Sequence, residues 1–247
     1  MEGWRADTYG ERIAADYDAR LPGRLDTAAC VELLAALAGG GPVLELGVGT
    51  GRVALPLAAR GLQVDGIDAS AAMVARLKAK PGGAGVRVVV GDFAAVPAPG
   101  AAYRLVYVVF NTLFCLLAQD DQARCFAAVA DRLAGDGVFV VEAFVPDPAR
   151  LAKRQDVTVE RIEPDRVELS AVRYDPLAQR IDAQHVTLTP GGVHLAPVAL
   201  RYAWPAELDL LARLAGLRLR DRWGGWRREP LDADSGQHVS VYERAAP

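Results

Sequence analysis

The stretch Val43-Leu44-Glu45-Leu46-Gly47-Val48-Gly49-Thr50-Gly51-Arg52 decides the fold of this chain. Its apolar start predicts a buried strand, and the three alternate glycines predict a tight turn that leads into a helix. Because glycine has no Cβ, this turn can approach a ligand closely, and a helix that starts near Gly51 directs free N–H groups at that ligand. Glu45, just before the turn, would repel a pyrophosphate but can receive an amino group.

A second interpretation of the same turn stays open. Residues 49–54 also fit the dinucleotide fingerprint G-x-G-x-x-A, which follows a strand and opens a helix. Glu45 argues against a bound pyrophosphate, and the motif begins near residue 43 rather than at the N-terminus. The turn therefore disfavours a dinucleotide, and an NAD(P)-dependent Rossmann oxidoreductase is the alternative function.

The composition is that of an ordinary soluble globular protein. The 247 residues carry a net charge of −3, with 51% hydrophobic and 24% charged residues, which leaves no electrostatic footprint for nucleic acid. The sequence has no apolar stretch of about 18 residues and no signal-peptide layout, so we expect a cytoplasmic protein without a membrane or nucleic-acid partner. Cys30, Cys115 and Cys125 lack metal-ligand spacing, and no metal site is expected.

The order of elements after residue 42 predicts a parallel sheet with helical crossovers. Apolar runs predict strands at 43–46, 63–68, 86–91, 105–110 and 138–144. Helical periodicity predicts helices at 51–60, 70–79 and 119–134, after two N-terminal helices at about 10–20 and 25–38. Several strands are apolar almost throughout, as expected when helices cover both faces of a sheet.

A different pattern follows residue 149. Apolar and polar residues alternate between turn signals, which predicts a four-stranded antiparallel meander at 156–163, 166–174, 180–189 and 193–203. The chain then returns to a helix at 205–215 and two strands at 217–223 and 237–244. We therefore expect N-terminal helices with an α/β core (1–149), an antiparallel β insertion (150–203) and a C-terminal segment that completes the core (204–247).

Acidic residues end the second and third predicted strands. Asp68 lies at the tip of the second strand, where a carboxylate can accept both hydroxyls of an adenosine ribose. The alternative is a helix cap, by Asp68 or Ser70, for the helix at 70–79. In the Gly91-Asp92-Phe93 turn, the carboxylate can take the exocyclic amine of a base, and a purely structural turn is the alternative.

Together, the glycine turn, Asp68, the Gly91-Asp92-Phe93 turn and the strand end Phe110-Asn111-Thr112 resemble the motifs of class I S-adenosylmethionine (SAM)-dependent methyltransferases. The resemblance implies a seven-stranded, Rossmann-like α/β methyltransferase fold, here with an antiparallel β cap insertion, and SAM as the cofactor. It implies these cofactor-binding residues: Tyr9, Tyr17, Glu45, Gly47, Gly49, Thr50, Arg52, Asp68, Ala69, Met73, Gly91, Asp92, Phe93, Phe110, Asn111 and Thr112.

Two tyrosines in the N-terminal segment suggest a lid. Tyr9 and Tyr17 are eight residues apart, so a helix over 10–20 would place them on roughly one face. Similar Tyr-Asp segments in small-molecule methyltransferases fold over the methionine part of SAM. The alternative is an amphipathic helix anchored by two aromatic side chains.

The methyl acceptor is less well defined by the sequence. Residues 111–114 read Asn-Thr-Leu-Phe and lack the two prolines of methyltransferases that act on nucleic-acid bases or proteins. We therefore expect a small-molecule acceptor, methylated on nitrogen or oxygen, such as a bacterial secondary metabolite or amino sugar. His185, in the insertion, is the preferred candidate for a catalytic base, with a structural strand residue as the alternative. Glu142 could bind a cationic substrate.

Two further alternatives concern the protein as a whole. A non-catalytic SAM-binding protein would show the same cofactor motifs without an accessible acceptor pocket. The insertion could also mediate a homodimer instead of covering the substrate, because the exposed edge of a meander pairs readily with a second copy.

Overall fold

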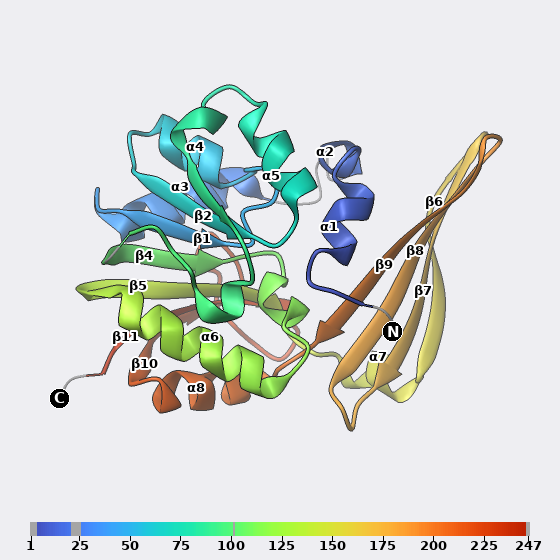
Figure 1. Cartoon of the computed structure of the whole chain (residues 1–247). Helices are drawn as coiled ribbons and strands as arrows, with labels where there is room; N and C mark the ends of the chain where they lie inside the picture. Colours follow the sequence, from blue (N-terminus) through green and yellow to red (C-terminus); the bar gives the residue numbers. More distant parts are fainter. Residues whose placement is uncertain (1–3, 21–25, 101, 246–247) are drawn as a thin grey trace.

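The computed structural model describes residues 4–20, 26–100 and 102–245. One sheet contains seven strands in the order β10-β11-β5-β4-β1-β2-β3 (Figure 1). Its parallel part consists of β1 (Val43–Leu46), β2 (Val64–Asp68), β3 (Arg87–Val90), β4 (Tyr103–Val108) and β5 (Leu133–Phe144). β11 (Gln237–Arg244) runs antiparallel to both β5 and β10 (Leu217–Trp223).

Helices cover both faces of this sheet, because its strands carry apolar side chains on both sides. α6 (Gln119–Arg132) and α8 (Pro205–Leu214) pack on the face that carries Phe139 and Tyr242. α3 (Thr27–Ala38) and α4 (Ala54–Ala59) pack on the opposite face, which carries Tyr107. The remaining core helices are α5 (Ala71–Lys78) and the short turns η1 (Gly83–Gly85), η2 (Phe93–Ala95) and η3 (Thr112–Cys115).

A second, antiparallel sheet follows β5 and the short helix α7 (Pro148–Ala152) and extends away from the core (Figure 1). Its four strands pair in chain order: β6 (Gln155–Glu163), β7 (Arg166–Asp175), β8 (Arg180–Thr189) and β9 (Gly192–Arg201). The N-terminal helices α1 (Thr8–Ile13) and α2 (Tyr17–Arg20) lie between this sheet and α5. There Ile13 and Ala14 pack with Met73 of α5 and Ala196 of β9.

The predicted fold class is confirmed, with three local differences. The single helix predicted at 10–20 is wrong: it breaks between α1 and α2, where Arg76 Nε donates to the carbonyl of Ala14 (3.1 Å) and Arg76 Nη2 donates to that of Ala15. β5 begins earlier than predicted, at Leu133, because this residue pairs with Tyr103 before a register shift. α7 escaped prediction. Residue 25, the predicted start of the second N-terminal helix, lies outside the described residues.

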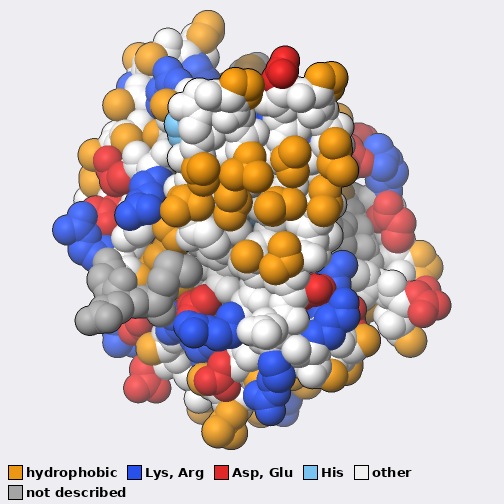
Figure 2. Space-filling view, turned by 90° about the vertical axis from the view of Figure 1, so that its right-hand side faces the viewer, with side chains coloured by type: hydrophobic (Ala, Val, Ile, Leu, Met, Phe, Trp, Pro, Cys, Tyr) orange, Lys and Arg blue, Asp and Glu red, His pale blue; other side chains and the backbone are white. Residues whose placement is uncertain are grey.

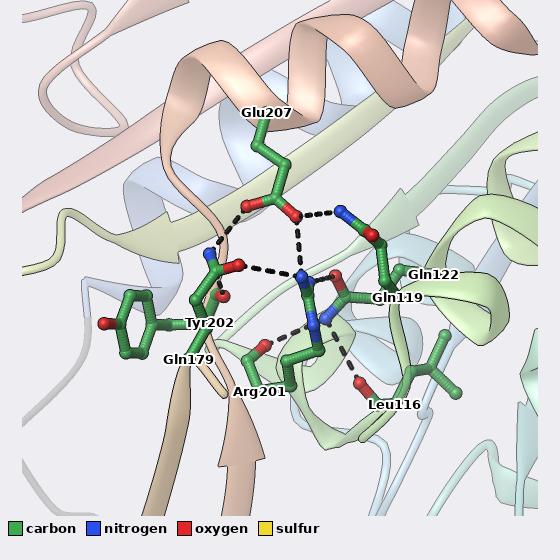
Figure 3. A network of polar contacts seen from close by, with 7 residues as sticks. All are labelled: Leu116, Gln119, Gln122, Gln179, Arg201, Tyr202 and Glu207. Atoms are coloured by element: carbon green, nitrogen blue, oxygen red, sulfur yellow. Dashed lines mark hydrogen bonds and ion pairs between the residues drawn. The ribbon is translucent and has the colours of Figure 1, made fainter. Parts of the chain in front are cut away.

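Arg201, at the end of β9, joins the second sheet to the core (Figure 3). Its guanidinium donates to Gln122 Oε1 of α6 at 2.7 Å and to Glu207 Oε1 of α8 at 2.8 Å. Gln179, in the β7–β8 turn, accepts from Arg201 at 2.9 Å and donates to Glu207 at 2.7 Å. The Arg201 side chain is buried, and a buried charge requires such partners. The network therefore holds one end of the second sheet against α6 and α8.

The face of the second sheet that points away from the core is apolar. Two rows of cross-strand neighbours cover it: Val159, Leu169, Val186 and Leu195, and then Ile162, Val167, Leu188 and Val193. Figure 2 shows a band of hydrophobic side chains on this side of the molecule. Ile162 is 74% exposed and Val193 is 62% exposed, so the described part of the chain leaves much of this face open to solvent.

Candidate active site

One cavity of about 380 Å³ lies where the seven-stranded sheet, the N-terminal segment and the second sheet meet. The carboxyl ends of the parallel strands form one wall, through Gly47, Gly49, Asp68, Asp92 and Phe110. Tyr9, Ile13 and Tyr17 form a second wall, and β6 to β9 form the third through residues that include Glu160, Glu168, His185 and Ala196. This is the edge at which open α/β sheets bind their ligands.

Most of the predicted site residues line this cavity: Tyr9, Tyr17, Gly47, Gly49, Asp68, Ala69, Met73, Asp92, Phe93, Phe110, Asn111, Thr112 and His185. Four predicted cofactor residues lie behind its walls. Thr50 donates from Oγ1 to Asp18 at 2.6 Å, and the Gly91 N–H group donates to the Asp68 carbonyl at 2.9 Å. The other two, Glu45 and Arg52, contact groups on the side of the sheet that α3 covers: Tyr107 for Glu45 and Thr27 of α3 for Arg52.

Asp68 is held by backbone groups on either side. One carboxylate oxygen accepts from Gly49 N–H at 2.7 Å and the other from Ser70 N–H at 2.8 Å. Burial raises the pKa of Asp68, although both N–H groups oppose this shift. The cap of α5 belongs to Ser70, whose Oγ accepts from Met73 N–H at 3.2 Å. Each carboxylate oxygen of Asp68 keeps a lone pair that can accept a hydrogen bond from a ligand.

The glycine turn has two different constraints. Gly47 has φ +74°, and a Cβ atom there would lie 2.4 Å from the Thr112 side chain. Gly49 has φ +53°, but a Cβ atom there would meet nothing within 4 Å, because it would project into open space. The first glycine is therefore required by packing against η3, while the second keeps the cavity clear beside Asp68.

Glu45 is buried at the end of β1 and accepts a hydrogen bond from Tyr107 Oη at 2.7 Å. Burial raises its pKa to about 8, although the hydrogen bond and the charge of Arg52 oppose this shift. The Arg52 guanidinium lies 5.8 Å from the centre of the Phe110 ring and donates to Thr27 Oγ1 at 3.0 Å. Both side chains thus lie close behind the cavity wall.

Contacts of the N-terminal segment were not predicted from the sequence. Glu11 of α1 accepts from Ser70 Oγ at 2.8 Å and from Ala72 N–H at 3.1 Å. Asp18 of α2 pairs with Lys80 at 2.7 Å in addition to its bond from Thr50. Glu11 and Asp18 lie 32 to 61 residues away from the hydroxyl and backbone N–H groups that donate to them. The sequence shows that both residues can accept hydrogen bonds, but it does not show which distant groups donate to them. These contacts hold α1 and α2 over the cavity.

The second sheet supplies side chains to the far end of the cavity. His185 of β8 lines it, whereas His194 is exposed on β9 and His238 is buried in the core beside Ser240 (2.8 Å). Burial lowers the pKa of His238 to about 4. Glu168 lines the same end and accepts from Arg166 at 2.7 Å.

Glu142 does not line this cavity. It faces a second cavity of about 260 Å³, with Arg52, Trp226 and Gln237, so the suggestion that it binds a cationic substrate in the main cavity has no support in the structure. Among the described residues, no cluster of three or more His, Cys, Asp or Glu side chains could hold a metal ion. No described helix is long and apolar enough to cross a membrane.

Comparisons with known proteins agree with this geometry. A methyltransferase-domain family model matches residues 43–137. The structure of the CcbJ methyltransferase from Streptomyces caelestis is similar to this chain with a TM-score of 0.93 and 44% identity, over 98% of this chain and 100% of that one. The cypemycin N-terminal methyltransferase of Streptomyces sp is 28% identical over 83% of this chain and 84% of its own length.

A more distant similarity concerns the fold alone. The sugar N-methyltransferase KedS8 from Streptoalloteichus sp has a TM-score of 0.69 at 20% identity, over 94% of this chain and 93% of that one. The α/β sheet with a ligand cavity at its carboxyl edge and the comparisons together define the class: this chain belongs to the class I SAM-dependent methyltransferases. It is an enzyme that uses SAM, and neither the NAD(P)-dependent oxidoreductase nor the non-catalytic alternative is supported.

Proposed function

We propose that this enzyme transfers the methyl group of SAM to an amine nitrogen of a small-molecule acceptor. The supporting observation is the cavity, which is bounded on three sides by strand ends, the N-terminal segment and the second sheet. A space of about 380 Å³ suits small molecules rather than a folded polymer. Glu160 and Glu168 lie at the end formed by the second sheet. Arg166 (2.7 Å) and Arg161 (3.9 Å) pair with Glu168, and its carboxylate keeps lone pairs that can accept a hydrogen bond from an amine.

The name of one relative supports the choice of nitrogen: the protein that is 28% identical to this chain is an N-terminal methyltransferase. We extend this chemistry to the present enzyme and propose an amino sugar or another amine-bearing bacterial secondary metabolite as the acceptor. Oxygen methylation is the second candidate, which the assay below distinguishes.

The cavity walls fit SAM. Asp68 would accept hydrogen bonds from the ribose hydroxyls with its remaining lone pairs, and the open space at Gly49 would allow the backbone to approach the cofactor. We assign the other donor-side roles as follows: Met73, Asp92 and Phe93 to the adenine, and Gly47, Ala69, Phe110, Asn111 and Thr112 to the wall along the methionine part. Glu45, Thr50, Arg52 and Gly91 would act from behind this wall.

The N-terminal segment is proposed to close over the cofactor. Tyr9 and Tyr17 face the cavity from α1 and α2 despite the break between these helices. Burial raises the pKa of Tyr17 to about 12, so its hydroxyl stays protonated at neutral pH. Glu11 and Asp18 would keep the segment closed through their contacts with α5, Thr50 and Lys80.

The proposed reaction depends mainly on alignment. Bound SAM supplies an electrophilic methyl carbon, and the chain has to hold the acceptor nitrogen in line with it and exclude water. An amine that enters as a cation has no free lone pair, so a base must first remove its proton. We assign this role to His185, which faces the cavity from the second sheet.

An acceptor screen tests the function. The purified enzyme is incubated with SAM and matched pairs of amino sugars and their hydroxyl counterparts, and S-adenosylhomocysteine and methylated product are measured by mass spectrometry. Turnover of amines, with none for the hydroxyl partners, is expected. Methylation of hydroxyl compounds alone would overturn the choice of nitrogen.

The apolar outer face of the second sheet is proposed to bind a second copy of this chain. Apolar rows that cross all four strands and are exposed on β6 and β9 are unusual on a monomer, and two such sheet faces can pack against each other. Ile162→Asp should convert a dimer to a monomer in light scattering coupled to gel filtration. Leu177→Asp is the control, because Leu177 is 95% exposed in the β7–β8 turn and lies off this face. A monomeric parent protein would contradict the proposal.

Three predictions from the sequence remain part of this proposal. They are the division of the chain at 149/150 and 203/204, a cytoplasmic location, and the lack of a nucleic-acid partner.

A further inference from the structure

The turn between β4 and η3 has an unusual backbone. Phe110 and Asn111 both lie in the left-handed region, with φ +57° and +61°. Asparagine tolerates this conformation, but it is unfavourable for phenylalanine, because its Cβ approaches the following carbonyl oxygen. Both residues line the active-site cavity, so some other contact must hold this part of its wall in place.

Glu142 of β5 supplies that contact. β5 continues past the end of β4, and the last paired residues are Val108 and Val141. At the next position of β5, a Glu142 carboxylate oxygen accepts from the Phe110 N–H group and the Glu142 carbonyl accepts from the Asn111 N–H group at 3.4 Å. Two residues further along β5, the Phe144 N–H group donates to Asn111 Oδ1 at 2.7 Å. Two side-chain bonds and one backbone bond thus connect β5 to this turn beyond the last regular pair of the two strands.

Packing alone does not support the turn from behind. Val109, Arg52 and Glu142 border the second cavity, of about 260 Å³, next to the segment that carries Phe110. The Arg52 guanidinium lies 5.8 Å from the centre of the Phe110 ring. The second cavity replaces close-packed side chains on this side of the turn. The hydrogen bond from Phe110 N–H therefore restrains the turn there, in addition to the turn's own backbone bonds from Thr112 N–H to the Val109 carbonyl (3.2 Å) and from Phe114 N–H to the Asn111 carbonyl (2.9 Å).

We propose that Glu142 is a positioning residue for methyl transfer: through the Phe110 N–H group it fixes the left-handed turn that forms the methionine-side wall of the cavity. It acts by the position of its acceptor oxygen and not by its charge. This inference rests on the proposed binding of SAM along Phe110, Asn111 and Thr112. Glu142 is 7% exposed and borders the second cavity and not the active-site cavity, so contact with either substrate is not part of its role.

Two substitutions separate position from charge. Glu142→Gln removes the charge but keeps an acceptor oxygen at the same distance from the backbone, so the Kd for S-adenosylhomocysteine should stay within about twofold of the parent value. Glu142→Asp keeps the charge but withdraws the oxygen by one methylene group. Because a buried N–H group then loses its partner, the Kd and the KM for SAM should rise by roughly 5- to 50-fold.

Gln237→Ala is the matched control, since Gln237 borders the same second cavity and pairs with Phe144 through its backbone, which the substitution keeps. Its Kd should equal that of the parent. Unfolding midpoints are measured for all three variants. A purely structural role would lower the midpoint of Glu142→Asp while leaving the affinity of the folded protein unchanged, and that result would overturn the proposal. A Gln variant as weak as the Asp variant would also overturn it, because charge would then be the cause.

If Glu142→Asp does not fold, Glu142→Met tests the same contact, because it keeps the length of the side chain but removes the acceptor for Phe110 N–H and should raise the Kd in the same way. Unchanged affinity would contradict the proposal. Failure of the parent protein to bind S-adenosylhomocysteine is a separate outcome. It would contradict the proposed donor site itself, and the proposed role of Glu142 would fall with that site.

Discussion

The two long walls of the active-site cavity are built on different principles. The donor wall consists of backbone turns at strand ends, where Gly49 and Ser70 N–H groups hold Asp68 and two left-handed residues shape the turn after β4. The acceptor wall is the inner face of an antiparallel sheet, where side chains such as His185 and Ala196 stand at paired positions on β8 and β9. A wall whose shape depends on backbone conformation tolerates few substitutions. In a wall formed by side chains on paired strands, one residue can be substituted without changing the others.

The largest expected effect comes from the donor wall. Gly49→Ala should weaken S-adenosylhomocysteine binding by on the order of 100-fold, because a methyl group would block the backbone approach and its hydrogen bonds. Calorimetry measures this. Gly61→Ala is the matched control: its φ is +86° and its Cβ would also meet nothing within 4 Å, but Gly61 lies outside the cavity. Both variants should lose about 1–2 kcal/mol of stability from left-handed strain. Equal affinities would refute the close approach.

Asp68→Ala is expected to have the next largest effect. Loss of hydrogen bonds to a charged acceptor should weaken cofactor binding by roughly 1.5–3 kcal/mol. A 2′,3′-dideoxy analogue of S-adenosylhomocysteine completes a double-mutant cycle. The analogue should bind the parent weakly, and Asp68→Ala should bind the analogue and S-adenosylhomocysteine equally well. Additive losses would show that Asp68 does not contact the ribose.

Glu45→Gln should have a smaller effect on affinity, about 0.5–1.5 kcal/mol, because Glu45 lies behind the donor wall. Its pKa of about 8 lies above the ordinary value of 4.5 for a glutamate, so its contribution to stability is complete below pH 4.5 and is lost as the pH rises through about 8. Without ligand, the free energy of unfolding of the parent should therefore fall between pH 6 and 9 by on the order of 1–3 kcal/mol more than that of the Gln variant. Parallel pH profiles would argue against this shift.

Substitutions in the acceptor wall should have almost no effect on the affinity for the methyl donor. His185→Ala should change the Kd for S-adenosylhomocysteine by less than about twofold while lowering kcat by about 100-fold, the range of general base catalysis. His194→Ala, on the exposed part of β9, is the control and should leave kcat unchanged. Normal turnover in the His185 variant would show that His185 is not the base, and that the protein accelerates methyl transfer by aligning the two substrates.

The same contrast explains what the sequence could predict. Glycine spacing and acids at strand ends report backbone conformation, so Gly47, Gly49, Asp68 and Asp92 were predicted and line the cavity. The direction of Glu142 could not be predicted, because it depends on where β4 ends relative to β5. The helix breaks after Ile13, where Arg76 donates to the Ala14 carbonyl, 62 residues away in the chain. The periodicity of residues 10–20 does not show this distant contact. On the acceptor wall, alternation predicted the strands but not which of their residues face the cavity.

The Arg201 network also has a consequence for how this enzyme could change its acceptor. It fastens the second sheet to the core beside the β7–β8 turn, while the hairpin ends at 163–166 and 189–192 lie at the opposite end of the strands. Lengthening or exchanging those hairpins would therefore leave the anchored end and the methyl-donor machinery in register. The end of the sheet that carries the two hairpins can therefore be exchanged while the end held by Arg201 stays in place. Transplanting the hairpin end between related enzymes is a direct route to new acceptors.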